Sequence, residues 1–314
     1  MIVTKRRKLN RVDRAQLKKE IWRHRELYVF LIPCLVILLI FSYGPMYGVL
    51  MAFQDVKIGD TFGQSEWVGL YHFQRFFKSS WLSVIVKNTV LISLLANVVV
   101  WPIPLLLAIL LHNSNNIVIK KLTQNFTYLP YLLSMVVIVS IVNLFCAGET
   151  GLINILFHNL GLKRINFFGD PKWVYPLHVV TTVWRNAGYS AIVYLGALAA
   201  VDEQMIEAAK VDGAGKLRCI WSIQIPTILP TVITMLILNM GHMFSASVDK
   251  SLLLQTDLNL ANSEIIATYV YKAGVMGSQY GFATAMGVFQ NVVNLMMLFL
   301  VNFIAKKLTD ISVI

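Results

Sequence analysis

Long apolar runs alternate with polar stretches along the whole chain. The apolar runs lie at Leu27–Phe53, Val84–Leu111, Phe126–Phe145, Leu177–Ala200, Pro226–Val248 and Phe282–Ala305. Each run has about 20 residues or more, the length that an α-helix needs to cross the hydrocarbon core of a bilayer. The pattern therefore predicts an all-α integral membrane protein with six transmembrane helices.

The composition agrees with this prediction, because 57% of the 314 residues are hydrophobic and only 14% are charged. A soluble domain needs more charge to cover its surface. The net charge of +11 could indicate nucleic acid, but all the basic residues except Lys87 and Arg185 lie outside the apolar runs, and they are densest in the first 25 residues. Such clusters set topology and contact anionic lipid. We expect a lipid bilayer as partner and no nucleic acid.

The basic N-terminal segment also helps to predict the topology. A signal peptide is not expected, because the run Leu27–Phe53 is too long and no small-residue cleavage site follows it. Six spans place both ends on one side, where the segments carry 17 Lys and Arg against nine at most on the other. The positive-inside rule then predicts cytoplasmic N- and C-termini. The domains expected are a basic segment 1–26, a six-span domain 27–305 and a tail 306–314.

The segments between the runs carry local signals of their own. We expect a short loop around Lys120 and Lys121, a helix at Leu152–Leu160 and another at Glu264–Tyr271. The three cysteines Cys34, Cys146 and Cys219 lie far apart, and their spacing predicts neither a disulfide framework nor a metal site.

The loop at 201–225 is polar and charged, unlike the runs on either side of it. The residues around Ala208 are good helix formers. Asp202 can cap the start of the helix that they form, and Gly213 suits a turn at its end. Pro226 is expected to begin the next span, because proline is tolerated at the first position of a helix. The loop is predicted to form a helix–turn–helix.

This loop resembles the EAA loop of the membrane subunits of binding-protein-dependent ATP-binding-cassette importers. Glu207-Ala208-Ala209, Gly213, Ile223 and Ile225-Pro226 have the spacing of that pattern, and Ile225 replaces its leucine. The resemblance implies a type I importer permease fold in which this loop is a cytoplasmic coupling helix that docks on an ATPase. The residues expected to couple are Glu207, Ala208, Ala209, Asp212, Gly213 and Ala214.

Short runs elsewhere extend the resemblance over nearly the whole chain. They are Tyr43–Gly48, Trp67–Leu70, Asn88-Thr89, Tyr128–Pro130, Gly287–Gln290 and Lys306-Lys307. In this order they are similar to the first permease subunits of oligo- and polysaccharide importers, a group that includes the alginate importer. This resemblance implies a bacterial cytoplasmic (inner) membrane location, a second homologous permease subunit, a dimer of ATP-binding-cassette ATPases and an extracytoplasmic solute-binding protein.

The chain has no Gly-x-x-x-x-Gly-Lys-Ser/Thr phosphate loop. We therefore expect it to bind no cofactor itself, and ATP and Mg to belong to the ATPase partners.

Polar residues inside apolar runs tend to face a bundle interior or a water-filled path. By resemblance to the maltose importer, sugar contacts are expected near Tyr131, Met135, Arg185, Asn186, Tyr189 and Met243, and helical spacing adds Asn239 and His242. Polar groups also hydrogen-bond between helices. That alternative stays open for all of these residues, and we prefer it for Gln290, Asn291 and Asn294.

Arg185 needs an anion or several acceptors if it is buried. No acidic residue lies within the six runs. Three explanations remain open: Arg185 reaches the membrane surface, a partner subunit supplies a carboxylate, or an anionic substrate binds it.

The function expected is the import of oligosaccharides, with uronate-containing ones such as alginate as a candidate class. The alternative is the same fold importing a non-sugar solute such as a polyamine or an anion. An intramembrane enzyme is not expected, because the sequence has no His-Glu-x-x-His, no Gly-x-Ser-x-Gly and no carboxylate pair in its runs. A channel or secondary transporter would need no EAA-like loop.

Overall fold

The computed structural model describes residues 22–60, 64–240, 244 and 247–309, and it is mostly helical, at 78%. Residue contacts divide the chain into two units, Met1–Met51 and Ala52–Ile314. The predicted boundaries at residues 26/27 and 305/306 stay predictions.

The helical run of the first unit consists of α2 (Arg25–Leu38), the π-helical turn η1 (Leu39–Tyr43) and α3 (Gly44–Met46), and η2 (Tyr47–Phe53) continues it into the second unit. Together they form the candidate span Arg25–Phe53. The π turn lies just before Pro45, whose missing N–H interrupts regular helical hydrogen bonding. No side chain of α2 is buried within this chain.

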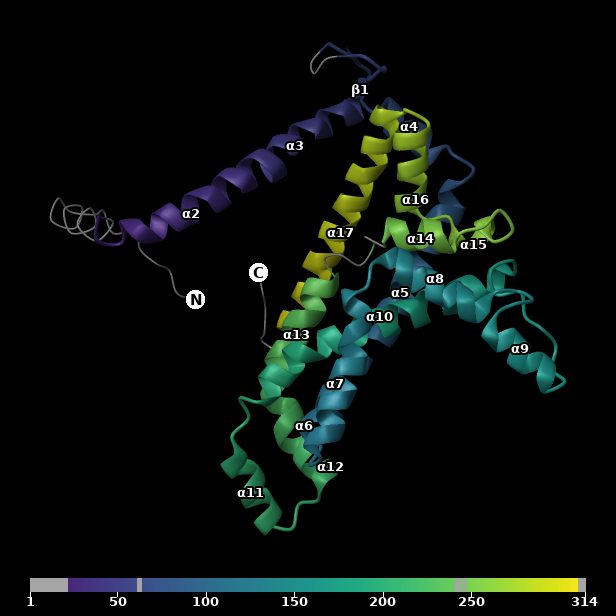
Figure 1. The fold of residues 1–314 in the computed structure, drawn as a ribbon. Coiled ribbons are helices and arrows are strands. Elements are labelled where there is room, and N and C mark those ends of the chain that lie inside the picture. Colours follow the sequence, from purple (N-terminus) through teal and green to yellow (C-terminus); the bar gives the residue numbers. More distant parts are fainter. Residues whose placement is uncertain (1–21, 61–63, 241–243, 245–246, 310–314) are drawn as a thin grey trace. The chain divides into compact units, whose positions relative to one another are not determined.

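The second unit holds the other elements of the described part of the chain (Figure 1). They are β1 (Gln54–Asp55), β2 (Glu66–Trp67), α4 (Tyr71–Phe77), α5 (Leu82–Val100), α6 (Pro102–His112), α7 (Ile117–Leu132), α8 (Met135–Cys146), α9 (Leu152–Asn159), η3 (Pro171–Trp173), α10 (Val174–Leu198), α11 (Glu203–Val211), α12 (Lys216–Cys219), η4 (Ile220–Gln224), α13 (Ile225–Met240), α14 (Val248–Leu254), α15 (Leu260–Ser263), α16 (Ile266–Tyr271), η5 (Lys272–Met276) and α17 (Tyr280–Thr309). The two short strands pair antiparallel, with Gln54 opposite Trp67.

Helix α10 is the centre of this unit, because it packs against α5, α6, α7 and α13. One apolar core lies where α6, α10 and α13 meet and includes Ala108, Ala191, Leu198 and Ile228. A second core joins α4, α5, α16 and α17 through Phe76, Ile85, Phe282 and Met286. In Figure 1, α11 and α12 lie at one end of the unit, and α4 and α16 lie at the other.

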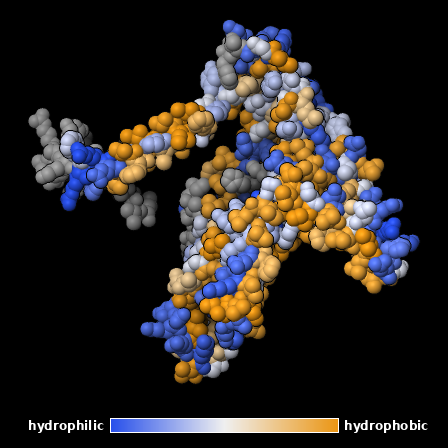
Figure 2. Space-filling view, in the orientation of Figure 1, coloured by the Kyte–Doolittle hydropathy of each residue, from blue (hydrophilic) through white to orange (hydrophobic). Residues whose placement is uncertain are grey.

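Within the described residues, four helical segments are long and apolar enough to cross a membrane: Arg25–Phe53, Leu82–His112, Lys216–Met240 and Tyr280–Lys307. The pair α7 and α8 makes a fifth if it counts as one bent span. Helix α10, at the place of the predicted fourth span, is not among them, because polar residues such as His178, Arg185 and Asn186 lower its hydropathy. Orange apolar atoms cover the helix bodies in Figure 2, whereas blue polar atoms gather over α11.

The predicted third span, Phe126–Phe145, is not one straight helix. The chain bends by 109° between α7 and α8. Leu133 and Ser134 are extended there, and the Ser134 hydroxyl accepts a hydrogen bond from Val137 N and so caps α8. The predicted loop around Lys120 and Lys121 is also wrong, since both residues lie inside α7.

The predicted start of a span at Pro226 is wrong as well. The helix already begins at Lys216 and runs without a break to Met240. The π turn η4 directly precedes Ile225 and Pro226, so the chain passes the proline by a wider turn instead of a new helix start. The helices predicted at Leu152–Leu160 and Glu264–Tyr271 are confirmed as α9 and α16, within one or two residues.

Candidate functional site

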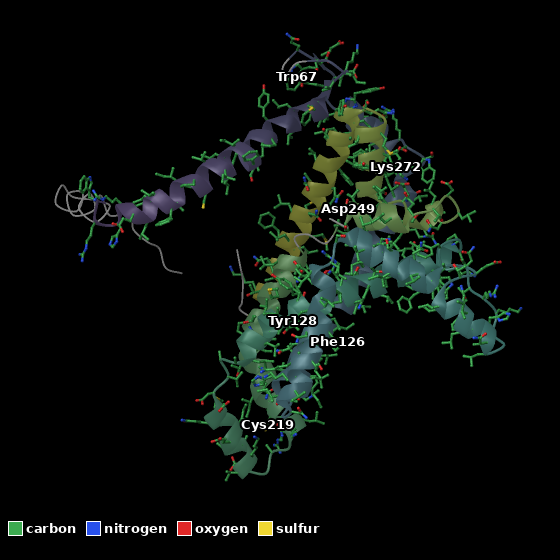
Figure 3. All side chains as sticks on the ribbon, viewed as in Figure 1. Trp67, Phe126, Tyr128, Cys219, Asp249 and Lys272 are labelled. Carbon is green, nitrogen blue, oxygen red and sulfur yellow. The ribbon has the colours of Figure 1, made fainter. Side chains whose placement is uncertain are left out.

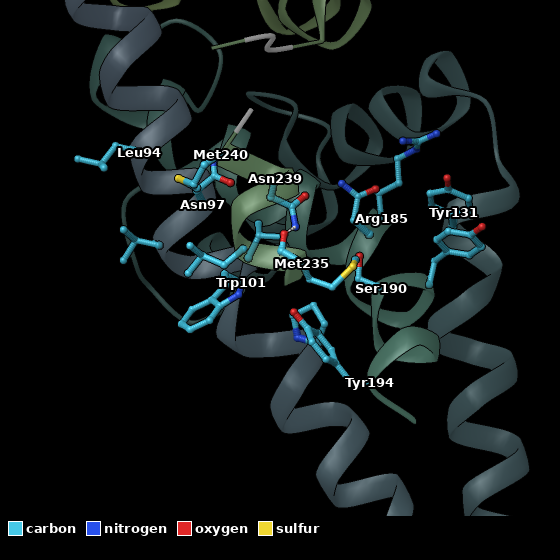
Figure 4. A pocket seen from close by; sticks show the side chains of 16 residues that line it. Leu94, Asn97, Trp101, Tyr131, Arg185, Ser190, Tyr194, Met235, Asn239 and Met240 are labelled. Carbon is cyan, nitrogen blue, oxygen red and sulfur yellow. Dashed lines mark hydrogen bonds between the residues drawn. The ribbon is translucent and has the colours of Figure 1, made fainter. Parts of the chain in front are cut away.

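A cavity of about 590 Å³ lies between α5, α6, α7, α10 and α13 (Figure 4). Its lining residues are Leu94, Asn97, Val98, Val100, Trp101, Pro104, Tyr131, Arg185, Asn186, Tyr189, Ser190, Tyr194, Met235, Leu236, Asn239 and Met240. The volume is in the range of small-molecule binding sites, which usually combine apolar and aromatic walls with a few polar groups. The cavity has both kinds of wall.

The close approach of α7 and α10 shapes one wall of this cavity. Gly188 lies so near Thr127 that a Cβ added there would stand 2.1 Å from the Thr127 carbonyl oxygen. One turn along α7, Tyr131 stacks on Tyr189 with ring centroids 3.8 Å apart and an interplanar angle of 2°. The glycine thus permits the contact that holds two aromatic rings face to face at the cavity.

Arg185 adds a positive charge to the same wall. Its guanidinium carbon lies 5.2 Å from the centroid of the Tyr131 ring, within cation–π distance. Its Nε is buried and has no hydrogen-bond partner in the described part of the chain. In Figure 4, Arg185 and Tyr131 lie on the same side of the cavity. This arrangement leaves the guanidinium able to donate to a ligand.

Amide side chains from α5 and α13 also line the cavity. Asn239 Nδ2 donates to the Met235 carbonyl at 2.8 Å, and Asn97 Nδ2 donates to the Ser93 carbonyl at 2.8 Å. These bonds to the preceding helical turn fix the amides in place. Each amide also carries an oxygen that can accept hydrogen bonds from hydroxyl groups.

A second cavity of about 290 Å³ adjoins the first and shares Asn97, Val100, Arg185, Asn186 and Asn239 with it. Met135 from α8 and Lys250 from α14 also line it. Lys250 is a residue that the sequence reasoning missed. It lies in a mixed segment between two apolar runs, where a single lysine is the usual solvated residue, and only its position against α10 distinguishes it.

The structure brings most of the predicted path residues together. Tyr131, Arg185, Asn186, Tyr189 and Asn239 line the larger cavity, and Met135 lines the smaller one. His242 and Met243 lie outside the described residues.

Gln290 and Asn294 do not line either cavity. Gln290 Nε2 donates to the Phe244 carbonyl at 2.6 Å, and the Phe244 N–H donates to Asn294 Oδ1 at 3.0 Å. The two side chains of α17 therefore hydrogen-bond the backbone of Phe244, in agreement with the preferred role of hydrogen bonding between elements.

The loop at 201–225 forms the predicted helix–turn–helix. Asp202 caps α11 by accepting a hydrogen bond from Gln204 N at 2.9 Å, and Gly213 takes a φ of +83°. None of the residues of α11 is buried, and Val211 and Leu217 expose most of their apolar surface. Glu207 and Asp212 are exposed as well. The loop thus presents an accessible surface with both charged and apolar side chains.

A polar cluster lies at the opposite end of the unit, where Lys272 is labelled in Figure 3. Lys272 Nζ lies 2.5 Å from Glu264 Oε2 and 2.6 Å from Gln255 Oε1. Glu264 also accepts a hydrogen bond from Thr268 at 2.7 Å. Because its partners already satisfy Glu264, this cluster fixes α16 and η5 in place.

Comparison with known proteins gives consistent matches. The family model described as "Binding-protein-dependent transport system inner membrane component" matches residues 102–310. The protein LplB of Bacillus subtilis is 39% identical over 93% of this chain and 91% of its own length. The polygalacturonan/rhamnogalacturonan transport system permease protein YteP of the same organism is 38% identical over 94% of this chain and 92% of its own.

A chain in the crystal structure of a bacterial alginate ABC transporter, in complex with an alginate pentasaccharide-bound periplasmic protein, matches with a TM-score of 0.85. It is 32% identical, over 95% of this chain and 100% of the solved one.

Proposed function

Because the chain belongs to the family of binding-protein-dependent transport system inner membrane components, we propose that it is a permease subunit of an ATP-driven importer of oligosaccharides, including uronate-containing ones. The observation that carries this proposal is the cavity between α5, α6, α7, α10 and α13, with its stacked tyrosines, amides and arginine. The names of YteP, which state polygalacturonan and rhamnogalacturonan, and of the alginate transporter support the substrate class, because polygalacturonan and alginate consist of uronic acids.

Each kind of side chain in the cavity has a role in this proposal. Aromatic rings offer flat apolar surfaces for the C–H faces of sugar rings, and Tyr131 stacked on Tyr189 makes such a surface. Asn186 and Asn239 exchange hydrogen bonds with hydroxyl groups. Arg185 binds a carboxylate through two parallel N–H bonds. Met135, His242 and Met243 complete the proposed path.

The proposed topology has six spans, with α7–α8 as a bent span and α10 as a further one. A helix with the polar residues of α10 can cross a bilayer when those residues face a cavity and not the lipid. In this topology α11 and both termini are cytoplasmic, in the bacterial inner membrane, as the distribution of Lys and Arg favours.

The proposed partners follow from the surfaces of the chain. Helix α11 and Gly213 form the coupling element that docks on an ATPase dimer, with Glu207 and Asp212 as its charges and Ala208, Ala209 and Ala214 as its small residues. ATP and Mg bind to that dimer. A second homologous permease subunit completes the path, and an extracytoplasmic binding protein delivers the sugar. Closure of the ATPases then switches the cavity between the two sides of the membrane.

A reconstitution experiment tests the proposal. The full complex of this chain with its second permease, ATPases and binding protein is placed in proteoliposomes, and uptake of tetragalacturonate, an alginate tetramer, spermidine and sn-glycerol 3-phosphate is measured with and without ATP. The expected result is ATP-dependent uptake of at least one of the two saccharides. Uptake of only spermidine or glycerol phosphate would instead establish the non-sugar alternative. The positively charged side chains of Arg185 and Lys250, which line the cavities, disfavour the polyamine because it is also positively charged.

A further inference from the structure

Lys250 is a buried cation whose recorded partners are both neutral. It is 8% exposed, and its Nζ donates to the Thr182 hydroxyl and, at 3.4 Å, to the His178 carbonyl. Both acceptors belong to α10, so Lys250 is anchored on the helix that also carries Arg185. A buried ammonium ordinarily has an anionic partner, because removing a charge from water is costly.

Arg185 and Lys250 line the same cavity of about 290 Å³. Burial, with a further contribution from the Arg185 guanidinium, lowers the pKa of Lys250 to about 8. Lys250 lies in α14, between the spans α13 and α17, and with this pKa it stays mostly protonated at neutral pH. Two positive charges therefore face one small cavity.

No carboxylate balances these charges within the described residues. The cavity lining contains no Asp or Glu, and the recorded salt bridge joins Lys272 to Glu264 at a different place. Positions 241–243 and 245–246, which lie outside the described residues, hold Gly, His, Met, Ser and Ala, none of which is acidic. The described residues therefore leave these two charges without a carboxylate, and a bound ligand can supply one.

We infer that Arg185 and Lys250 form one carboxylate-binding subsite, and that Lys250 is a residue that determines preference for acidic over neutral sugars. This inference rests on the proposed function and names the group of the substrate that the two cations bind. Arg185 supplies planar paired donors, whereas Lys250 supplies a point charge that Thr182 and the His178 carbonyl hold in position. The larger cavity next to it, with the tyrosines and amides, then holds the neutral part of the sugar.

Direct binding measurements test this subsite. The assembled complex, in lipid nanodiscs and without binding protein, is titrated with tetragalacturonate and with its fully methyl-esterified form, which has the same sugar rings and no charge. The wild-type complex should bind the acid more tightly. Lys250→Met should weaken binding of the acid about tenfold or more, because a charged hydrogen bond is lost, and change binding of the ester less than about twofold.

Matched variants separate charge from structure. Lys250→Arg keeps the charge and should keep the preference for the acid, and Arg185→Gln should reduce that preference as Lys250→Met does. Lys172→Met removes an exposed cation away from both cavities and should leave both affinities unchanged. If Lys250→Met affects acid and ester equally, or the wild-type complex shows no preference, the subsite does not exist.

A carboxylate of the second permease subunit against Lys250 in a structure of the complex would also overturn the subsite. These results are distinct from failure of the proposed function, which would appear as absence of ATP-dependent saccharide uptake in proteoliposomes.

Discussion

Asn113 and Gln224 exchange two side-chain hydrogen bonds across 111 positions of sequence. Asn113 Nδ2 donates to Gln224 Oε1 at 2.9 Å, and Gln224 Nε2 donates to Asn113 Oδ1 at 3.0 Å. Asn113 is the C-cap of α6, and Gln224 is the last residue of the π turn η4 and only 1% exposed. The pair therefore joins the end of one span to the helix that follows α11 and the Gly213 turn.

Loss of one amide of this pair should destabilise the protein. Asn113→Ala leaves the buried Gln224 amide without its partner, which costs about 1–3 kcal/mol. The thermal unfolding midpoint of the purified complex should fall, while Asn115→Ala, at an exposed amide two residues along, should leave it unchanged. The exchange Asn113→Gln with Gln224→Asn keeps both groups and should recover part of the loss. An unchanged midpoint for Asn113→Ala would show that the pair adds nothing.

The effect of a substitution at Gly213 should depend only on how readily the new residue adopts a positive φ. Its φ is +83°, and an added Cβ would meet no atom within 4 Å. Gly213→Val should disfavour this turn by about 1–2 kcal/mol and lower ATP-driven uptake about five- to thirtyfold. Gly213→Asn should retain most uptake, because asparagine adopts the left-handed region more readily. Gly215→Ala is the control, since Gly215 has a negative φ and equally open surroundings. Equal activity of the Val and Asn variants would contradict the proposed role of the turn.

Gly188 should not tolerate even a methyl group. The added Cβ would lie 2.1 Å from the Thr127 carbonyl oxygen, so α7 and α10 would have to separate. We expect Gly188→Ala to destabilise the complex by about 1–3 kcal/mol and to reduce uptake by disturbing the stack of Tyr131 on Tyr189. Gly196→Ala, on the same helix with nothing within 4 Å, should be neutral or slightly stabilising. The measurement is the thermal unfolding midpoint of both variants, and equal midpoints would refute the close contact at Gly188.

The stacked tyrosines should act on substrate affinity through the Tyr131 ring. Tyr131→Leu should raise the KM for tetragalacturonate uptake about two- to tenfold, which corresponds to the binding free energy that one aromatic pair contributes. Tyr131→Phe keeps the ring and should change KM little. Phe126→Leu, an exposed aromatic on the same helix, is the control and should match wild type. A larger effect of Tyr131→Phe than of Tyr131→Leu would mean that the hydroxyl, and not the ring, is important.

Most of the long helices and five of the residues that line the larger cavity could be predicted from the sequence, because their signals are local. Apolar runs marked most of the long helices, and Asp202 and Gly213 marked the cap and turn of the loop through their side-chain and backbone chemistry. Arg185, Asn186 and Tyr189 could be grouped because they lie within about one turn of a single helix, and such spacing can be read directly from the sequence.

What the sequence could not supply depends on contacts between distant segments. Lys250 looks like an ordinary loop lysine until α14 packs on Thr182 and His178. The bend at Ser134 ends a helix inside a continuous apolar run, so hydropathy alone does not mark it. Pro226 misled the prediction because a π turn lets the chain pass a proline that would otherwise begin a helix.

The helix from Lys216 to Met240 has 25 residues and no intervening loop. At a rise of 1.5 Å per residue it is roughly 37 Å long, enough to cross the hydrocarbon core of a bilayer. Lys216 begins it three residues after the Gly213 turn, and Asn239 at its far end lines both cavities. In the proposed mechanism, a rotation or translation of the first turn is carried along this continuous helix to Asn239, so that ATPase closure and substrate release become parts of a single movement.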